Sequence, residues 1–251
     1  MIVGHVRGHH TRTDELDEHA RASWMGKLDA RAKIVGVVVF VTVAAMLTVT
    51  ELIFAALAHS VVFAAFSQVP ARHLLKAYAG ALPFILMASV SVFLFAGIDH
   101  GIGMWARTSA CVIALLVLAS ATESLQLFAG LRRLGVPKII STLLMLTYKY
   151  IVLMADELGR MKTARKARGF SGGRSLFDLR SLKIIGYTAG MVFVRASDRA
   201  EKGYEGLKMR GFNFDLKTWR RTRLAAADLA FIAWFAVVSG TLMTFQLGAF
   251  A

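Results

Sequence analysis

The sequence predicts an all-α integral membrane protein with about five transmembrane helices and long cytoplasmic helices. Hydrophobic residues make up 56% of the 251-residue chain, which is more than soluble proteins use. The apolar residues form runs close to the ~20 residues that a helix needs to cross a bilayer. Five such runs stand out, at positions 34–49, 52–69, 79–98, 105–122 and 224–247.

The connections between these runs alternate in charge. Basic residues occur before the first run, between the second and third, and after the fourth, at Lys27, Arg31, Lys33, Arg72, Lys76, Arg132, Arg133 and Lys138. The short 50–51 turn and the 99–101 loop contain neither Lys nor Arg. Because cytoplasmic loops carry the excess of Lys and Arg, the basic connections and the amino terminus are expected inside. The pattern predicts a multi-pass membrane protein, and the family resemblance given below implies a bacterial or archaeal plasma membrane.

This topology divides the chain into four segments. They are a cytoplasmic lead, four transmembrane helices, a cytoplasmic helical region, and a last transmembrane helix with an external carboxyl terminus, at 1–33, 34–122, 123–223 and 224–251. The lead has no continuous apolar core, so a cleaved signal peptide is not expected. A histidine-containing tail can bind a transition metal, but a solvated tail needs no such role, and we predict no metal site. The histidines of the lead are His5, His9, His10 and His19.

Positive charge concentrates in the cytoplasmic region. The net charge of the chain is +14, and residues 156–223 hold 17 Lys and Arg against 7 Asp and Glu, a balance of +10. Charge gathered on one side of a membrane protein fits the cytoplasmic face with its anionic headgroups, so nucleic-acid binding is not expected. The apolar stretch 139–155 looks like a sixth span, but Lys149 near its middle makes a crossing costly. A helix from Pro137 to Arg168 along the membrane surface is predicted instead.

A second amphipathic helix is expected from about residue 176 to Arg210. Its early part contains Gly186 and Gly190, which lie one helical turn apart. Small residues at this spacing let two helices approach closely, so these glycines are candidates for a helix crossing. Two glycines in a flexible helix would give the same pattern, and both interpretations stay open.

A repeated tetrapeptide ends both cytoplasmic helices. The first copy is Ala167-Arg168-Gly169-Phe170, and the second, 42 residues later, is Met209-Arg210-Gly211-Phe212. Glycine readily takes the left-handed conformation that ends a helix, and a cation is favoured in the last turn, so each copy can be a simple cap. Two copies on the water side also fit docking, because a guanidinium at a helix tip can bind a carboxylate in two-pronged fashion beside a phenylalanine anchor. A soluble partner with two matching sockets is predicted.

Catalytic and nucleotide-binding motifs are missing from the sequence. It contains no GxxxxGK[ST] or HExxH pattern, and no pair of acids within an apolar run. We therefore expect a chain that is not an enzyme and has no catalytic residues. Two other classes remain as alternatives. A stand-alone secondary transporter would need ionisable residues around a midplane cavity, and an integral membrane enzyme would need a catalytic constellation near the interface.

The chain resembles the transmembrane T component, or EcfT family, of energy-coupling factor ABC transporters over nearly its whole length. The two tetrapeptides, the Leu28-Asp29-Ala30-Arg31-Ala32-Lys33 segment and the 132–137 link carry the resemblance. The compact length, the 23–29 lead and the 82–86 segment at the start of the third span are most similar to the CbiQ and NikQ branch of cobalt and nickel uptake systems.

This resemblance implies a role and a set of partners. Members carry crossed coupling helices whose Ala-Arg-Gly motifs dock into two cytoplasmic ATPase subunits, which bind the ATP and Mg, so the chain itself needs no cofactor. The motif at 167–169 matches fully, whereas Met209 replaces the usual alanine in the second copy. The chain would transmit ATP-driven motion to a substrate-binding membrane S component like CbiM or NikM, with a small accessory membrane subunit as a further partner. Cobalt or nickel would be imported, and a T component for a vitamin is the alternative.

Overall fold

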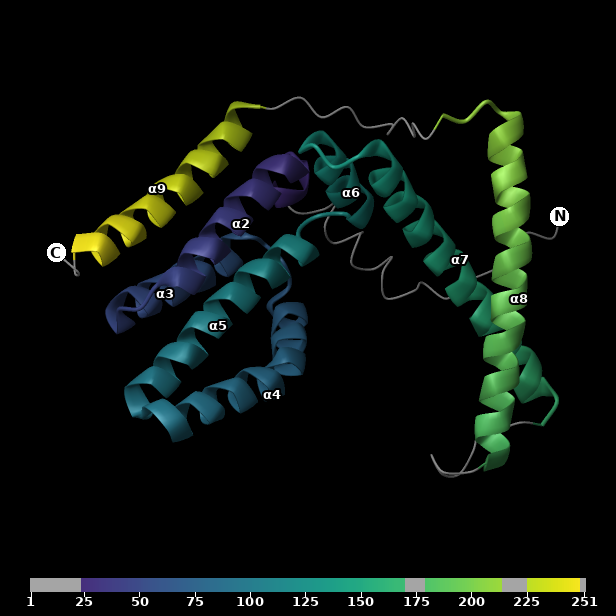
Figure 1. Ribbon diagram of the computed structural model, residues 1–251, viewed down its shortest axis with the longest axis horizontal. Coiled ribbons are helices and arrows are strands. Elements are labelled where there is room, and N and C mark those ends of the chain that lie inside the picture. The colour runs from purple at the N-terminus through teal and green to yellow at the C-terminus, as the bar shows by residue number, and fades with distance from the viewer. Residues whose placement is uncertain (1–23, 170–178, 214–224, 249–251) are drawn as a thin grey trace. The chain divides into compact units, whose positions relative to one another are not determined.

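The structure is entirely helical in the part of the chain that it describes. This computed structural model covers residues 24–169, 179–213 and 225–248, and it contains no strand in these ranges (Figure 1). The predicted all-α membrane fold is confirmed. The elements are η1 (Trp24–Lys27), α2 (Ala30–Met46), α3 (Thr50–Phe66), α4 (Ala71–Ala96), α5 (Ile98–Ser120), α6 (Ser124–Arg133), α7 (Lys138–Ala167), α8 (Leu179–Met209) and α9 (Ala226–Gly248).

The helices form two compact units. One, here called the inserted unit, contains the described residues of Val136–Lys217 and therefore α7 and α8. The other, called the bundle unit, contains the described residues of Thr13–Gly135 and Thr218–Ala251. Helix α6 packs against α2 and so belongs to the bundle unit.

The bundle unit has an apolar core between α2, α3, α5 and α9. Phe235 of α9 is buried in this core, and its ring lies edge-to-face with the rings of Phe40 from α2 and Phe63 from α3, at centroid distances of 6.0 Å and 5.0 Å. Edge-to-face contacts of this kind add to the free energy gained by burying the rings. The core therefore holds α9 against α2 and α3.

Four described helices are long and apolar enough to cross a membrane, namely α4, α5, α7 and α9. Helices α2 and α3 have 17 residues each and fall just short of that length. At the rise of an α-helix they are roughly 26 Å long, which is close to the ~30 Å of hydrocarbon. Large exposed side chains on α4 fit a lipid-facing helix, since Phe95 is 90% and Phe84 71% exposed. The protein is a multi-pass membrane protein.

The positions of two predicted connections are wrong, by a few residues each, while their external side stays a prediction. The 99–101 loop is part of the first turn of α5, and the 50–51 turn begins α3. The chain instead breaks at Gly97, whose φ of 95° only glycine adopts easily, and at residues 47–49. Polar residues fit a first helical turn, because its backbone N–H groups have no intrahelical partner and bind polar side chains or water instead. A drop in hydropathy therefore marks the end of an apolar run and not the end of a helix.

Helix α4 also begins earlier than predicted. It starts at Ala71 rather than near residue 79, so Pro83 lies well inside it. Figure 1 shows α4 bent along its length, as expected because a proline removes one intrahelical hydrogen bond and clashes with the preceding turn.

Side chains from two other helices stabilise the break between α2 and α3. Arg107 of α5 donates a hydrogen bond to the Leu47 carbonyl. The side chain of Gln246 from α9 accepts a hydrogen bond from the Thr48 N–H at 3.1 Å and donates one to the Met46 carbonyl at 3.2 Å. These contacts satisfy backbone groups that a helix end leaves without partners, so a polar break is tolerated inside an apolar bundle.

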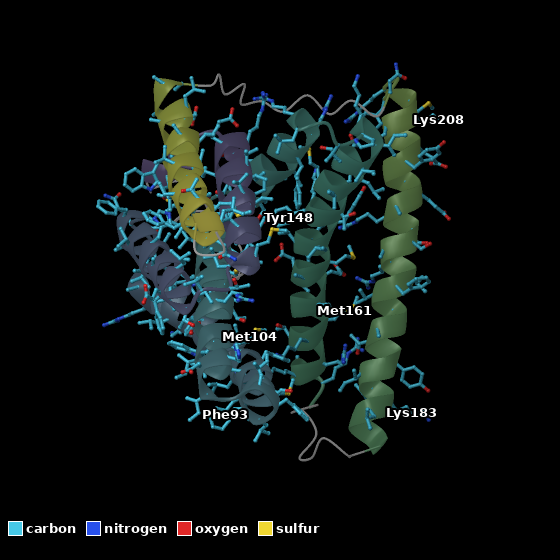
Figure 2. The ribbon with its side chains drawn as sticks, turned by 60° about the vertical axis from the view of Figure 1, so that its left-hand side comes forward. Phe93, Met104, Tyr148, Met161, Lys183 and Lys208 are labelled. Atoms are coloured by element: carbon cyan, nitrogen blue, oxygen red, sulfur yellow. The ribbon has the colours of Figure 1, made fainter. Side chains whose placement is uncertain are left out.

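Helices α7 and α8 of the inserted unit form an antiparallel pair. Figure 2 shows Tyr148 of α7 towards the end where Lys208 of α8 lies, and Met161 towards the end of Lys183. Helix α7 runs from Lys138 to Ala167, which confirms the predicted helix that continues past Lys149 without a break.

Candidate functional site

The carboxyl end of α7 is built around the first tetrapeptide. Ala167 is the last helical residue, Arg168 is the C-cap, and Gly169 follows with a φ of 83°. The Gly169 N–H donates a hydrogen bond to the Lys166 carbonyl at 3.0 Å. A left-handed glycine of this kind ends many helices, and the predicted capping role of Gly169 is confirmed.

The carboxyl end of α8 repeats this construction. Met209 is the last helical residue, and Gly211 has a φ of 64°. The Gly211 N–H donates to the Lys208 carbonyl at 3.0 Å, and the Phe212 N–H donates to the Leu207 carbonyl at 3.1 Å. This pair of hydrogen bonds is a Schellman motif, which fixes where the helix stops. Two helices thus end on an arginine followed by a left-handed glycine.

Both helix tips are open to solvent. The exposed motif residues are Ala167, Arg168, Gly169, Met209, Arg210 and Gly211. Among the described residues, neither the Arg168 nor the Arg210 guanidinium forms an ion pair or a side-chain hydrogen bond. Phe212 is half-buried, and Phe170 lies outside the described residues. Docking by these residues stays a prediction, with two unpaired cations at exposed tips as its basis.

The antiparallel pairing places the two motifs at opposite ends of the inserted unit. The ion pair between Glu157 of α7 and Arg195 of α8 fixes the register of the pair. Arg168 lies 11 residues beyond Glu157, and Arg210 lies 15 residues beyond Arg195 in the opposite direction. At the rise of an α-helix the two arginines are roughly 39 Å apart along the pair. A partner that binds both needs two sockets at about that separation.

The glycine at which α7 approaches α8 is Gly203. A Cβ at Gly203 would overlap the hydroxyl of Tyr150 on α7, whereas no atom lies within 4 Å of a Cβ placed at Gly186 or Gly190. The described residues therefore show a close approach at Gly203 and none at Gly186 or Gly190. Spacing alone does not say where a partner helix lies, so the role of Gly186 and Gly190 in a crossing stays a prediction.

Two cavities flank the α7–α8 contact. One, of about 430 Å³, is lined by charged groups that include Glu157, Arg195 and Arg199. The other, of about 460 Å³, is mostly apolar and extends to Gly211 and Phe212 of the second motif. The two helices therefore touch over a short length, and the second helix tip stands beside an unfilled apolar space.

Several residues with clear structural roles were missed by the sequence reasoning. Tyr150 and Glu157 hold the α7–α8 register, and Asp228 is a buried carboxylate in the first turn of α9. The available signal for Asp228 was an acid inside the apolar run 224–247, since ionisable residues in such runs are costly and usually have a partner. The described residues contain no group of three His, Cys, Asp or Glu side chains that could hold a metal ion.

The comparison with known proteins decides the family. The model of CbiQ, described as cobalt transport protein, matches residues 21–219. The chain belongs to the CbiQ family. The match contains both tetrapeptides and most of the bundle helices, and this transport family agrees with the multi-pass membrane fold.

Individual relatives are more distant. The cobalt transport protein CbiQ of Rhodobacter capsulatus is 31% identical over 140 residues, which is 56% of this chain and 52% of that protein. The uncharacterized proteins MJ1571 and MJ1089 of Methanocaldococcus jannaschii are 25% and 33% identical, over 61% and 42% of this chain and 52% and 38% of their own lengths. The chain spans about half the length, or less, of the curated relatives that it matches.

Proposed function

We propose that this chain is the membrane coupling subunit, or T component, of an energy-coupling factor transporter that imports cobalt. The observation that carries this proposal is the pair of exposed Arg-Gly helix ends at opposite ends of one antiparallel helix pair, in a chain of the CbiQ family. Two similar tips at opposite ends of one helix pair are what a scaffold needs to engage two soluble motor subunits.

Each helix tip presents an arginine that can insert into a groove of another protein. The left-handed glycine stops the helix directly after the arginine, so the guanidinium sits at the very end, where it can enter a groove without a following helical turn in the way. Arginine binds a carboxylate through two parallel hydrogen bonds, which fixes geometry as well as affinity. We infer that Arg168 seats in one ATPase subunit and Arg210 in the other, and that the ATPases supply the ATP and Mg chemistry.

The inserted unit is placed on the cytoplasmic side in this proposal. The basic balance of residues 156–223 supports that orientation through the positive-inside rule. Helix α7 is long enough, and apolar enough in its first half, to cross a membrane, but its last half carries charges throughout. A helix of this composition fits a position along the membrane surface, where one side meets lipid and the other meets the ATPases.

Cobalt is proposed as the cargo because the family and the Rhodobacter capsulatus relative are both described as cobalt transport proteins. Recognition of the ion is assigned to a separate S component of the CbiM or NikM kind, since the described residues of this chain offer no metal-ligand cluster. Nickel stays the nearest alternative, because a coupling subunit need not contact the ion that it helps to import.

Single arginine substitutions test the proposal. Arg168→Ala and Arg210→Ala should leave membrane insertion intact and weaken ATPase association by roughly 2 to 5 kcal/mol, the range for removing one partner of a hydrogen-bonded charge pair. Association is measured by co-purification of the ATPases and function by uptake of radiolabelled cobalt. Lys166→Ala and Lys208→Ala are matched controls, because both remove an exposed cation from the same last turns. Wild-type uptake in both arginine variants, or cobalt flux by the chain alone without ATP, would overturn the proposal.

A further inference from the structure

One buried carboxylate joins the starts of two helices in the bundle unit. Asp228 lies in the first turn of α9, and its Oδ2 accepts a hydrogen bond from the Ala225 N–H at 2.8 Å. Its Oδ1 accepts a hydrogen bond from the N–H of Asp29, the N-cap of α2, also at 2.8 Å. Both N–H groups are among those that helices leave without intrahelical partners, and a negative charge is favoured at helix amino termini. Asp228 therefore ties α9 to α2.

A second carboxylate extends this contact to α6. The Asp29 side chain accepts a hydrogen bond from the Arg31 N–H at 3.1 Å and so caps its own helix. The Nη1 atom of Arg133 lies 3.8 Å from Asp29 Oδ2. Arg133 is the last residue of α6, so the end of that helix meets the start of α2 at a charge pair.

A buried lysine brings in the end of α5. Lys33, one turn into α2, donates hydrogen bonds from Nζ to the Ala121 carbonyl at 3.3 Å and to the Met25 carbonyl at 2.6 Å. Ala121 is the C-cap of α5, where a cation is favoured by the exposed carbonyl groups of the helix end. We call Asp29, Lys33, Arg133 and Asp228 the buried charge cluster, because four helix ends meet there.

The degree of burial in this cluster is unusual for charged residues. Lys33 is 0%, Asp228 2% and Asp29 4% exposed. A buried set of charges seldom stabilises a fold more than apolar residues of similar volume would, because desolvation offsets the attraction between the charges. Breaking such a set by removing one member is strongly destabilising, however, since the remaining charges stay buried. The cluster therefore fixes four helix ends in one arrangement more than it adds net stability.

The buried charge cluster lies where the chain leaves the bundle unit for the inserted unit and where it returns. The inserted unit, Val136–Lys217, interrupts the sequence of the bundle unit. The first segment of the bundle unit ends at Gly135, two residues after Arg133. The described part of its second segment begins at Ala225, whose N–H donates a hydrogen bond to Asp228. In the described part of the chain, the residues that flank Val136–Lys217 therefore lie at the buried charge cluster on both sides. A displacement of the inserted unit that is passed along these two connections reaches the described bundle there.

We propose that the buried charge cluster is the fixed point at which motion of the inserted unit is delivered to the membrane helices, with Asp228 as the principal positioning residue. The inference rests on the proposed coupling function. Coupling of this kind requires that α6 and α9 move together with α2 and α5. Otherwise the segments that join the two units would bend, and the membrane helices would stay in place.

Asp228→Asn is the main test, carried out in the complete complex with its ATPases and S component. Asparagine keeps the shape and one acceptor but removes the charge and the second acceptor. The variant should assemble with the ATPases and hydrolyse ATP as the wild type does, while cobalt imported per ATP falls by roughly tenfold, within the usual range for coupling between linked sites. Asp99→Asn is the matched control, since Asp99 is an exposed acid in the first turn of α5 outside the cluster, and it should leave the ratio unchanged.

A second variant covers the case in which Asp228→Asn does not insert. Arg133→Gln removes the only partly exposed member, with 24% side-chain exposure, and should lower cobalt imported per ATP while assembly persists. An unchanged ratio in the variants that assemble overturns the proposal. Loss of assembly in both variants overturns it as well, because the cluster is then only a stabilising element. A wild-type chain that binds no ATPase would instead reject the coupling function on which the proposal rests.

Discussion

Substituting Gly203 by alanine tests the register in which α7 and α8 pair. A Cβ at this position would overlap the Tyr150 hydroxyl, so one of the two helices or the tyrosine must move. Overpacking of this kind costs about 1 to 3 kcal/mol. Alanine in a helix is favoured over glycine by about 1 kcal/mol, which offsets part of that cost. The single variant should therefore destabilise the helix pair by roughly 0 to 2 kcal/mol, from the balance of these two effects.

A double-mutant cycle separates the two contributions. With Tyr150→Phe the hydroxyl is gone, and the nearest remaining ring atom, Cζ, would lie 3.5 Å from the new Cβ, which is an ordinary contact. The alanine should then stabilise the pair by its helix preference alone. The expected coupling between the two positions is thus about 1 to 3 kcal/mol, the cost of the overlap.

Hydrogen exchange of the α7 and α8 amides in the purified chain measures these local opening free energies in all four variants. Gly186→Ala is the matched control, because no atom lies within 4 Å of its Cβ position, and it should stabilise α8 by about 1 kcal/mol with or without Tyr150→Phe. Additivity of Gly203→Ala and Tyr150→Phe within about 0.5 kcal/mol would refute the register, because distant positions behave in that way.

Two further predictions concern the same helix pair. Gly169→Ala and Gly211→Ala force a side chain into the left-handed region at a cost of about 1 to 2 kcal/mol each, so hydrogen exchange in the last turn of α7 or α8 should become faster, whereas Gly159→Ala within α7 should not have this effect. Glu157→Gln removes the ion pairs with Arg195 and Arg160, whose side chains are 50% and 68% exposed while that of Glu157 is 14% exposed. Because the two arginines reach solvent, the loss should be only about 0.2 to 1 kcal/mol for each pair and should shrink in high salt. A loss that does not depend on salt would contradict the assignment of these contacts as solvent-screened ion pairs.

The hydrophobic content and the length of the apolar runs were enough to predict the fold class, because a bundle of membrane helices is made of long apolar helices. They were not enough for the ends of the helices. The fall in hydropathy at residues 99–101 predicts a loop, yet these residues are helical, and the break lies at Gly97 with its positive φ. Hydropathy therefore located the bundle helices but misplaced several of their boundaries.

The local parts of the candidate site were also predictable, and the long-range parts were not. Gly169 and Gly211 end their helices as their position after Arg168 and Arg210 indicated, because capping depends on neighbouring residues alone. The contact of Tyr150 with Gly203 joins residues 53 positions apart, and the contact of Asp29 with Asp228 joins residues 199 positions apart. A local sequence pattern cannot identify partners so far apart in the chain. An acid within an apolar run does indicate that Asp228 has a hydrogen-bond or charge partner, but not which residue it is.

The central claim is that one copy of this chain carries two ATPase subunits, one on each helix tip. The most direct measurement is the mass of the intact, detergent-purified complex, for the wild type and for Arg168→Ala and Arg210→Ala. We predict two ATPase subunits for each copy of the chain, with the complex dissociating more readily in each variant. A wild-type complex without ATPases, or one whose two ATPases are held equally well after both arginines are replaced, would contradict the account.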